Sequence, residues 1–308
     1  MPRNGYFLPI VAVLGYAFLY APIISLIVYS FNESQLVTVW SGFSTKWYGK
    51  LLQDSQILQA AWLSLKIAFT SATLALCLGT LAALVLTRFG KFRIKSLLGG
   101  MVTAPLVMPE VITGLSLLLL FIAMESLFGW PKGRGITTLI LAHTTFCMAF
   151  VAVVVQSRLV SMDESLEEAA QDLGATPLRV FTDVTLPVIS PALVSGWLLA
   201  FTLSVDDLVI SSFVSGPGST TLPMVIFSKV RLGVSPEVNA LATIIISIVA
   251  LAVFVGGWRA FSVDSQVRKR CEPTDRPMRS GAPSFPLKAS SSGEPSKEPE
   301  QSNPMPLP

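Results

Sequence analysis

The sequence predicts an all-α membrane protein with six transmembrane helices. Of its 308 residues, 52% are hydrophobic and 13% are charged, and the mean hydropathy is +0.63. A soluble domain carries about 25% charged residues, so this chain has too few charged side chains to cover a soluble globule. Six apolar runs are long enough to cross the hydrocarbon core of a bilayer, which takes about 20 helical residues.

The predicted spans all lie within residues 1–262. The first apolar run is longer than the core of a cleaved signal peptide and no small-residue cleavage site follows it, so we expect it to remain as an anchor. More polar stretches separate the other runs. The expected spans are residues 7–29, 60–87, 97–124, 136–155, 192–214 and 240–258.

Basic residues near the ends of the spans set the expected orientation. Arg88, Lys91, Arg93 and Lys95 lie between the second and third spans, and Arg259 follows the sixth. Short loops rich in Lys and Arg stay in the cytoplasm, so we expect both stretches there. With six spans, both termini are then cytoplasmic.

Residues 263–308 differ from the rest of the chain. They are rich in Pro, Ser and charged residues and poor in large apolar side chains. Such a segment cannot bury enough apolar surface to offset the entropy lost on ordering. We therefore expect a disordered cytoplasmic tail.

Composition and spacing also exclude several kinds of site. The net charge of +3 is too small for a nucleic-acid-binding surface. Cys77, Cys147 and Cys271 lack the spacing of metal ligands, and no catalytic triad or zinc-protease motif is present. We expect no metal, no nucleic-acid partner and no catalytic residues.

Residues 156–189 form the longest polar stretch on the expected cytoplasmic side. Apolar residues recur there at helical spacing, and acidic residues occupy the remaining surface. Ser161 and Glu164 have the spacing of a capping box, and Gly174 stands where a left-handed residue would end a helix. This pattern predicts a short amphipathic helix.

A second short helix is expected directly after the turn. Thr176 suits an N-cap, and Pro177 suits the first helical position, where its missing N–H does no harm. The apolar pattern continues to Leu186-Pro187, where we expect this helix to end. The two helices together predict a hairpin beneath the bilayer, between the fourth and fifth spans.

The hairpin allows two interpretations. It could lie in the membrane interface as an amphipathic helix, or it could dock on a partner protein. Its polar face is acidic, and anionic lipids of the inner leaflet would repel such a face. A partner protein is therefore favoured.

The same stretch resembles the EAA loop of the membrane subunits of type I ABC importers, with Val184 where isoleucine is usual. In that family the loop is a coupling helix that docks on a cytoplasmic ATPase. The resemblance implies the same role here for Glu168, Ala169, Ala170, Gly174, Leu186 and Pro187. The sequence has no phosphate-binding loop of the Gly-x-x-x-x-Gly-Lys-Ser/Thr type, so we expect the partner to bind and hydrolyse ATP. The chain itself is then neither an enzyme nor a cofactor-binding protein.

The resemblance extends over about residues 8–262. This part of the chain is similar to permeases of putrescine/spermidine importers, above all those of the putrescine type. It implies an inner-membrane subunit that forms half of a polyamine pathway with a second, homologous permease. It also implies two cytoplasmic ATPase subunits and a periplasmic polyamine-binding protein. The matching segments include Tyr20-Ala21-Pro22, Ala104 to Pro109, Ile112 to Ser116 and Phe201 to Val209.

Two adjacent acids lie well inside the fifth predicted span. Asp206 and Asp207 follow Ser204, and ionisable groups at membrane depth mark substrate pathways. Ser204 adds a hydrogen-bonding group on the same helix, and we include it with the two acids among the candidate pathway residues. Lys66 is the one base well inside a predicted span, so negative charge remains that an organic dication could neutralise. The alternative is structural, with one aspartate capping a helix break and the other paired with a buried base.

Glu110 is a third acid at membrane depth. It follows Pro105 and Pro109, and prolines remove helical hydrogen bonds, which predicts a kinked helix lining a cavity. Glu110 is therefore a candidate pathway residue. Alternatively, it holds the loosened backbone together.

Trp47 and His143 complete the candidates. Trp47, on the first outer loop, is most simply a membrane-interface aromatic, but its ring could bind a cation, so we include it in the pathway. His143 has no acid or second histidine at ligand spacing, and we interpret it as a neutral hydrogen-bonding residue.

Two further functions stay open beside the polyamine importer. One is a secondary transporter driven by an ion gradient, which also uses broken helices and buried acids but often contains inverted repeats; no repeat is visible here. The other is a type I importer permease for another substrate, because the hairpin does not distinguish substrates. The intramembrane acids favour a cation, since an anion site would use bases or helix N-termini. Putrescine and spermidine are not distinguished.

Overall fold

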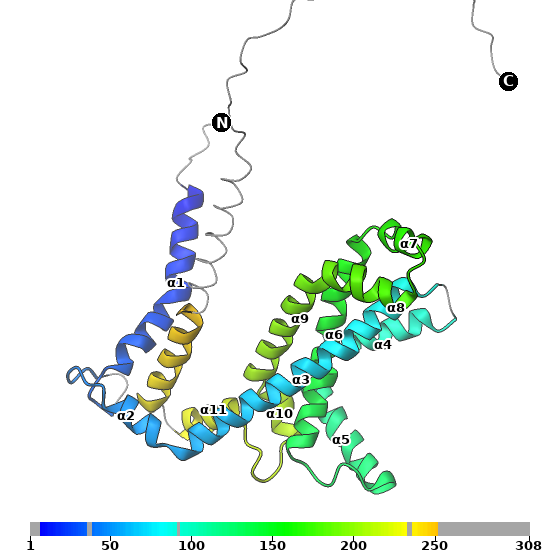
Figure 1. Ribbon diagram of the computed structural model, residues 1–308. Helices are drawn as coiled ribbons and strands as arrows, with labels where there is room; N and C mark the ends of the chain where they lie inside the picture. Colours follow the sequence, from blue (N-terminus) through cyan, green and yellow to red (C-terminus); the bar gives the residue numbers. More distant parts are fainter. Residues whose placement is uncertain (1–6, 36–38, 91–92, 233–235, 252–308) are drawn as a thin grey trace, which may run out of the picture. The chain divides into compact units, whose positions relative to one another are not determined.

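A computed structural model describes residues 7–35, 39–90, 93–232 and 236–251. These residues are helical apart from loops and one isolated bridge between Asn32 and Phe43. Figure 1 labels the elements. They are α1 (Phe7–Ser30), α2 (Lys46–Gln53), α3 (Ser55–Arg88), α4 (Lys95–Val107), α5 (Glu110–Phe128), α6 (Ile136–Ser161), α7 (Ser165–Asp172), α8 (Pro177–Val180), the π-helical turn η1 (Phe181–Thr185), α9 (Leu186–Asp206), α10 (Val209–Val214) and α11 (Leu222–Leu232), and a further helix spans Pro236–Leu251.

Five helices in the described ranges are long and apolar enough to cross a membrane. They are Pro9–Ser30, Ser55–Arg88, Glu110–Phe128, Ile136–Ser161 and Pro177–Asp206. The expected sixth span, residues 240–258, coincides in part with the shorter apolar helix Pro236–Leu251, and its remainder lies outside the described residues, as does the expected tail 263–308. The all-α membrane class is confirmed, and the count of six spans stays a prediction.

The expected third span is two helices rather than one continuous span. It breaks between α4 and α5, where Met108 is extended (φ −74°, ψ 138°) and Pro109 precedes the first residue of α5. Proline disfavours the helical conformation of the residue before it and cannot donate a backbone hydrogen bond. Pro105, in contrast, is accommodated inside α4.

The expected fifth span is also broken. The range 192–214 begins too late, because α9 starts at Leu186. It is also not continuous: Asp207 is extended (φ −66°, ψ 122°), and a new helix, α10, starts at Val209. The sequence analysis missed α11, which follows a loop after α10.

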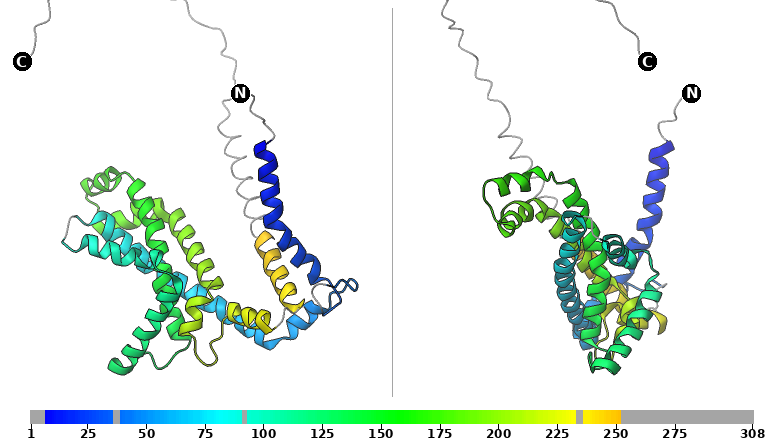
Figure 2. Two further views of the ribbon diagram at one scale, coloured as in Figure 1. Left: turned by 180° about the vertical axis from the view of Figure 1, so that it is seen from behind. Right: turned by 90° about the vertical axis from the view of Figure 1, so that its right-hand side faces the viewer.

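Helices α3, α6 and α9 pack along one another, as two views show (Figures 1 and 2). Close approach is possible because α3 presents a stripe of small, buried residues to α6, and a Cβ atom on Gly79 would lie 2.9 Å from the Cβ of Val151. Small residues let membrane helices approach closely enough for dense packing. The stripe consists of Ala68, Ala72, Ala75, Gly79 and Ala83.

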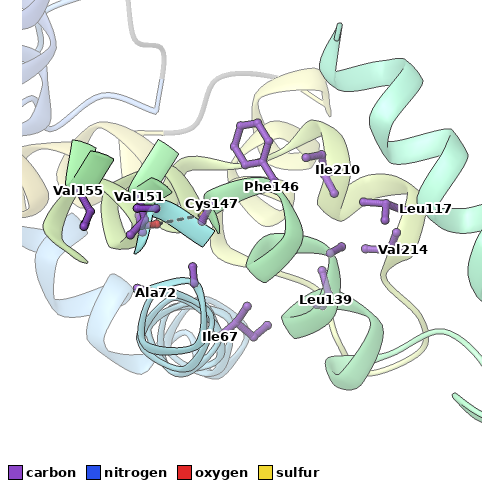
Figure 3. Close-up of a cluster of buried hydrophobic side chains, with 14 of the residues drawn as sticks. Ile67, Ala72, Leu117, Leu139, Phe146, Cys147, Val151, Val155, Ile210 and Val214 are labelled. Carbon is purple, nitrogen blue, oxygen red and sulfur yellow. Dashed lines mark hydrogen bonds between the residues drawn. The ribbon is translucent and has the colours of Figure 1, made fainter. Parts of the chain in front are cut away.

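A buried apolar cluster connects this core to α5 and α10, the helices that follow the two breaks (Figure 3). Leu117 of α5 lies in the same cluster as Ile210 and Val214 of α10. A Cβ atom on Gly114 would lie 2.7 Å from Phe213 Cδ2, so α5 and α10 pack closely at this glycine. The helices that follow the two breaks therefore support each other.

Candidate functional site

The predicted hairpin is present as α7 and α8. Gly174, between them, has φ +85°, the left-handed conformation expected for it. No other residue lies within 4 Å of a Cβ atom built on Gly174, so backbone conformation rather than space favours glycine. Pro177 occupies the first turn of α8, and Thr176 is its extended N-cap residue, although its hydroxyl makes no capping hydrogen bond.

Two details of the expected hairpin are wrong. The capping box of Ser161 and Glu164 does not form, because α6 continues through Ser161, whose hydroxyl donates to the Arg158 carbonyl at 2.8 Å. Asp163 instead accepts the Ser165 N–H at 3.0 Å. That N–H is the main reason why the pKa of Asp163 lies below its ordinary value.

The second helix also does not end at Leu186-Pro187. The turn η1 leads directly into α9, and the Leu186 N–H donates to the Phe181 carbonyl, five residues back. Pro187 has no N–H for the usual helical bond, and π-helix, which is rare, occurs mostly as single turns of this kind within α-helices. The hairpin is therefore continuous with a membrane-spanning helix.

Arg88 connects the hairpin to two core helices. At the end of α3, its guanidinium forms ion pairs of 2.8 Å with Glu164 and with Glu167 of α7. Glu167 in turn accepts the Thr185 hydroxyl at 2.6 Å, just before α9. Of the three acids of α7, Glu167 faces the protein, whereas Glu168 and Asp172 are exposed. Arg88 and Thr185 thereby join α7 to the end of α3 and to the start of α9.

Several other residues of the hairpin are exposed. Leu173 is 90% exposed and Leu178 is 74% exposed. Glu168 and Ala169 are exposed, and Ala170 is partly buried. Exposed leucines beside a carboxylate form a surface suited to a protein partner.

Asp207 lies at the break between α9 and α10 and caps α10. Its side chain is 6% exposed. One carboxylate oxygen accepts the Ile210 N–H at 3.2 Å, and the other accepts the N–H and the hydroxyl of Ser211 at 2.7 and 2.8 Å. This is the structural alternative raised for one of the two aspartates.

His143 of α6 completes this buried network. Its side chain is 2% exposed, and Nε2 lies 3.3 Å from Asp207 Oδ2 and 3.0 Å from Ser211 Oγ. Nδ1 lies 2.6 Å from Ser204 Oγ on α9. A carboxylate partner for His143 was missed in the sequence, because the two residues lie on different helices.

Asp206 has a different environment from its neighbour. It is exposed at the end of α9, and no other described residue donates a hydrogen bond to its carboxylate or forms an ion pair with it. Ser195 and Thr202 are exposed on the same helix at positions that align with Asp206, given the spacing of an α-helix. These three residues lie on one exposed face of α9, which also carries the exposed Leu198 and Leu199. We call the row of Ser195, Thr202 and Asp206 the α9 stripe.

Glu110 is the first residue of α5 and is exposed. Its position at a helix N-terminus favours a carboxylate, because unpaired N–H groups gather there. In the described ranges its side chain has no ion pair or hydrogen-bond partner. The break at Met108-Pro109 confirms the kink predicted from the prolines. The Glu110 carboxylate is accessible, and its place along a pathway stays a prediction.

Two candidate pathway residues are interior. Ser204 is 4% exposed and bonds to His143. Trp47 is 3% exposed, and its Nε1 donates to the Asn32 carbonyl at 2.7 Å. Lys46 and Lys50 already lie over the Trp47 ring, at 5.1 and 4.7 Å from its centroid, so the geometry gives no support to a further cation there.

An ionic cluster that the sequence analysis missed joins three helices. Lys229 Nζ of α11 lies 2.6 Å from Asp54, the N-cap of α3, and 3.5 Å from Glu237. The hydrogen bond from Lys229 lowers the pKa of Asp54 below its ordinary 3.8. Burial alone would lower the pKa of Lys229, but the bond to Asp54 and the two acidic charges outweigh it and raise that pKa.

In the described ranges, no group of three or more His, Cys, Asp or Glu side chains could hold a metal ion.

The candidate site consists of two parts. One is the hairpin of α7 and α8, and the other is the pair of helix breaks with the exposed acids Glu110 and Asp206.

Comparison with known proteins gives a consistent set of similarities. Residues 75–269 match the family "Binding-protein-dependent transport system inner membrane component". The chain is 60% identical to the putrescine transport system permease protein PotI of Escherichia coli (strain K12) over 83% of this chain and 92% of that protein. It is 46% identical to the spermidine/putrescine transport system permease protein PotC of the same strain, over 75% of this chain and 85% of that protein.

Solved structures show the same fold. A chain of a bacterial ABC transporter involved in the import of the acidic polysaccharide alginate superposes with a TM-score of 0.64 at 19% identity, covering 85% of this chain and 98% of that chain. A structure of a bacterial alginate ABC transporter in complex with its pentasaccharide-bound periplasmic protein gives a TM-score of 0.65, also at 19% identity, covering 81% and 90%.

Proposed function

The chain belongs to the family of inner membrane components of binding-protein-dependent transport systems, the permeases of ABC importers, and we propose that it carries polyamines, putrescine or spermidine, across the bacterial inner membrane. Family membership favours this over the ion-gradient-driven transporter that the sequence left open. Relatives named for putrescine and spermidine transport support the substrate class.

The observation that carries the substrate proposal is the unpaired carboxylate of Asp206. It lies on an exposed stripe of a membrane-spanning helix, with no described base beside it. A carboxylate facing lipid would be costly, so this stripe must face a polar pathway or a protein partner. An organic cation that loses its hydration there would regain stabilisation from charge-assisted hydrogen bonds.

The helix break adds a second attraction for a cation. Because α9 ends at Asp206, its last carbonyl groups lack helical N–H partners, and the negative end of its dipole lies beside the same carboxylate. Broken helices in transporters bind cations at such C-terminal ends. Glu110, exposed at the other break, would add a weaker contact.

A pathway of this kind needs a second subunit. The α9 stripe is exposed in the single chain, and a second, homologous permease would enclose it. Each permease then forms half of the pathway, with a periplasmic polyamine-binding protein delivering the substrate. Both termini of this chain lie in the cytoplasm in this arrangement.

The hairpin is the proposed docking surface for the ATPases. Two cytoplasmic ATPase subunits would bind ATP, one beneath each permease, and the exposed Leu173, Leu178 and Glu168 would contact one of them. Arg88 and Glu167 would transmit the movement of α7 to α3, and Thr185 would transmit it to α9. The permease itself holds no nucleotide and no other cofactor.

Uptake measurements test the proposal. The chain is expressed with its second permease, ATPase and binding protein in cells that lack other polyamine importers, and radiolabelled putrescine and spermidine are supplied separately. We expect ATP-dependent uptake of at least one of them. The control uses an ATPase subunit that binds but does not hydrolyse ATP. Assembled complexes that import neither polyamine would overturn the substrate assignment.

A further inference from the structure

We propose that His143 is a positioning residue, which fixes the break between α9 and α10 so that Asp206 faces the pathway. The two adjacent aspartates then have separate tasks: Asp207 belongs to the internal network, and Asp206 is left for the substrate. This inference rests on the proposed function, because it explains how the acidic site of that pathway is held in place.

The contacts of the network indicate which ring nitrogen of His143 donates a hydrogen bond toward Asp207. Nε2 lies 3.3 Å from the carboxylate oxygen Oδ2 of Asp207. If Nε2 carried no proton, its lone pair would face that oxygen inside the protein, which is repulsive. Nε2 therefore donates on this side, where Ser211 Oγ lies at 3.0 Å and Asp207 Oδ2 at 3.3 Å, and Nδ1 pairs with the Ser204 hydroxyl at 2.6 Å.

This assignment leaves Asp207 fully occupied. Its oxygens accept from the N–H groups of Ile210 and Ser211 and from the Ser211 hydroxyl, with His143 as a further donor. A carboxylate with these donors and 6% exposure needs no substrate to compensate its charge. Buried polar groups that are all satisfied hold a single arrangement of the helices around them.

The two ring nitrogens of His143 hold different helices. Nδ1 holds the last turn of α9 through Ser204, and Nε2 holds the first turn of α10 through Asp207 and Ser211. The break lies between these two attachments. One side chain of α6 therefore sets the position of both helix ends.

The Ser204 contact determines the direction of Asp206. Residues two positions apart lie about 200° apart around an α-helix. Because Ser204 is held against α6, Asp206 is turned to the opposite side of α9, where the α9 stripe is exposed. Without His143 the last turn of α9 is free to rotate or to continue through the break.

Thiol labelling tests this direction without any substrate. In an assembled complex whose Cys77, Cys147 and Cys271 are replaced by alanine, Asp206→Cys is treated with the cationic reagent 2-aminoethyl methanethiosulfonate. We expect the labelling rate to fall at least about fivefold when His143→Ala is added, because two buried hydrogen bonds are lost. The matched control is Thr202→Cys, one turn earlier on the α9 stripe, whose rate should not change.

A conservative variant separates positioning from folding. In His143→Gln the amide N–H can reach Asp207 and the amide oxygen can accept from Ser204, so labelling of Asp206→Cys should stay within about twofold of the parent. Ser204→Ala removes only one bond and should slow labelling less than His143→Ala. If His143→Ala fails to assemble, these two variants carry the test.

The outcomes are distinct for the two proposals. The positioning role is overturned if Asp206→Cys is labelled at the same rate in the parent and in combination with His143→Ala, His143→Gln or Ser204→Ala. An equal slowing at position 202 also overturns it, since that result means general loss of structure. Because labelling needs no polyamine, a failure of the polyamine assignment leaves this measurement unaffected.

Discussion

Asp206 and Asp207 are adjacent in the chain but lie in different environments. Asp207 is buried among donors from His143, Ile210 and Ser211, whereas Asp206 is exposed at the end of α9. The sequence located both acids at membrane depth and named both possible roles. It could not assign the roles, because the donors to Asp207 include a side chain on α6.

Glu110→Gln should reduce polyamine uptake, but less than Asp206→Asn does. Glu110 is accessible at the start of α5, and its charge is partly compensated by the helix N-terminus. We expect a loss of about twofold to fivefold, measured as initial uptake rate at equal amounts of assembled complex. A loss larger than that of Asp206→Asn would make Glu110 the principal acid of the pathway.

The ion pair of Asp54 with Lys229 should stabilise the protein in a pH-dependent way. Asp54→Asn keeps an N-cap but removes the charge, and should lower Tm by about 1–3 °C near neutral pH. Because the folded-state pKa of Asp54 is depressed, its contribution is present above the ordinary value of 3.8 and is lost as the pH falls through the folded value.

Thermal unfolding of the purified complex at several pH values checks this. The difference in Tm between wild type and Asp54→Asn should shrink below about pH 4. Glu237→Gln is the matched control, since its contact with Lys229 is longer, at 3.5 Å, and should shift Tm less. A difference that persists unchanged in acid would contradict the ionic origin.

At the scale of the elements, Gly174→Ala tests the hairpin. A residue with a Cβ atom at φ +85° costs about 1–2 kcal/mol, so the turn between α7 and α8 should distort. We expect polyamine uptake to fall at least about fivefold, with the protein still inserted in the membrane. Uptake rates and co-purification of the ATPase are the measurements.

Two further variants make this test specific. Gly174→Asn should retain most activity, because asparagine tolerates the left-handed conformation. Glu168→Ala should weaken ATPase co-purification without affecting the fold, since Glu168 is exposed and has no described partner. Full coupling in both Gly174→Ala and Glu168→Ala would remove the hairpin as the docking site.

Long apolar helices and the glycine turn of the hairpin followed from the sequence because each depends on local composition or conformation. The break at Pro109 was predicted as a kink, since proline acts on its own neighbours. The break at Asp207 was named only as an alternative. The network around it includes His143 of α6, and a contact between different helices cannot be predicted from the sequence near Asp207. The ionic cluster of Lys229 was missed for the same reason, because Asp54, its shortest contact, is 175 residues away in the chain.

At the scale of the whole molecule, the segment after Arg270 should be dispensable for transport. It lies outside the described residues and beyond residues 75–269, which match the family. Its few large apolar side chains leave little surface to bury against the membrane helices. Truncation after Arg270 should leave membrane insertion and polyamine uptake within about twofold of wild type. A loss of more than about tenfold at equal expression would show that this segment binds or regulates something.

Putrescine uptake by wild type and by Asp206→Asn, compared in the same importer-deficient cells, tests the central claim most directly. Asparagine keeps the size and hydrogen-bonding ability of aspartate but removes the charge, so membrane insertion and ATPase assembly should not change. We expect the uptake rate of Asp206→Asn to fall about tenfold, because the cation loses a charge-assisted contact where it is poorly hydrated. Equal uptake rates for the two proteins would contradict a cationic substrate held by Asp206.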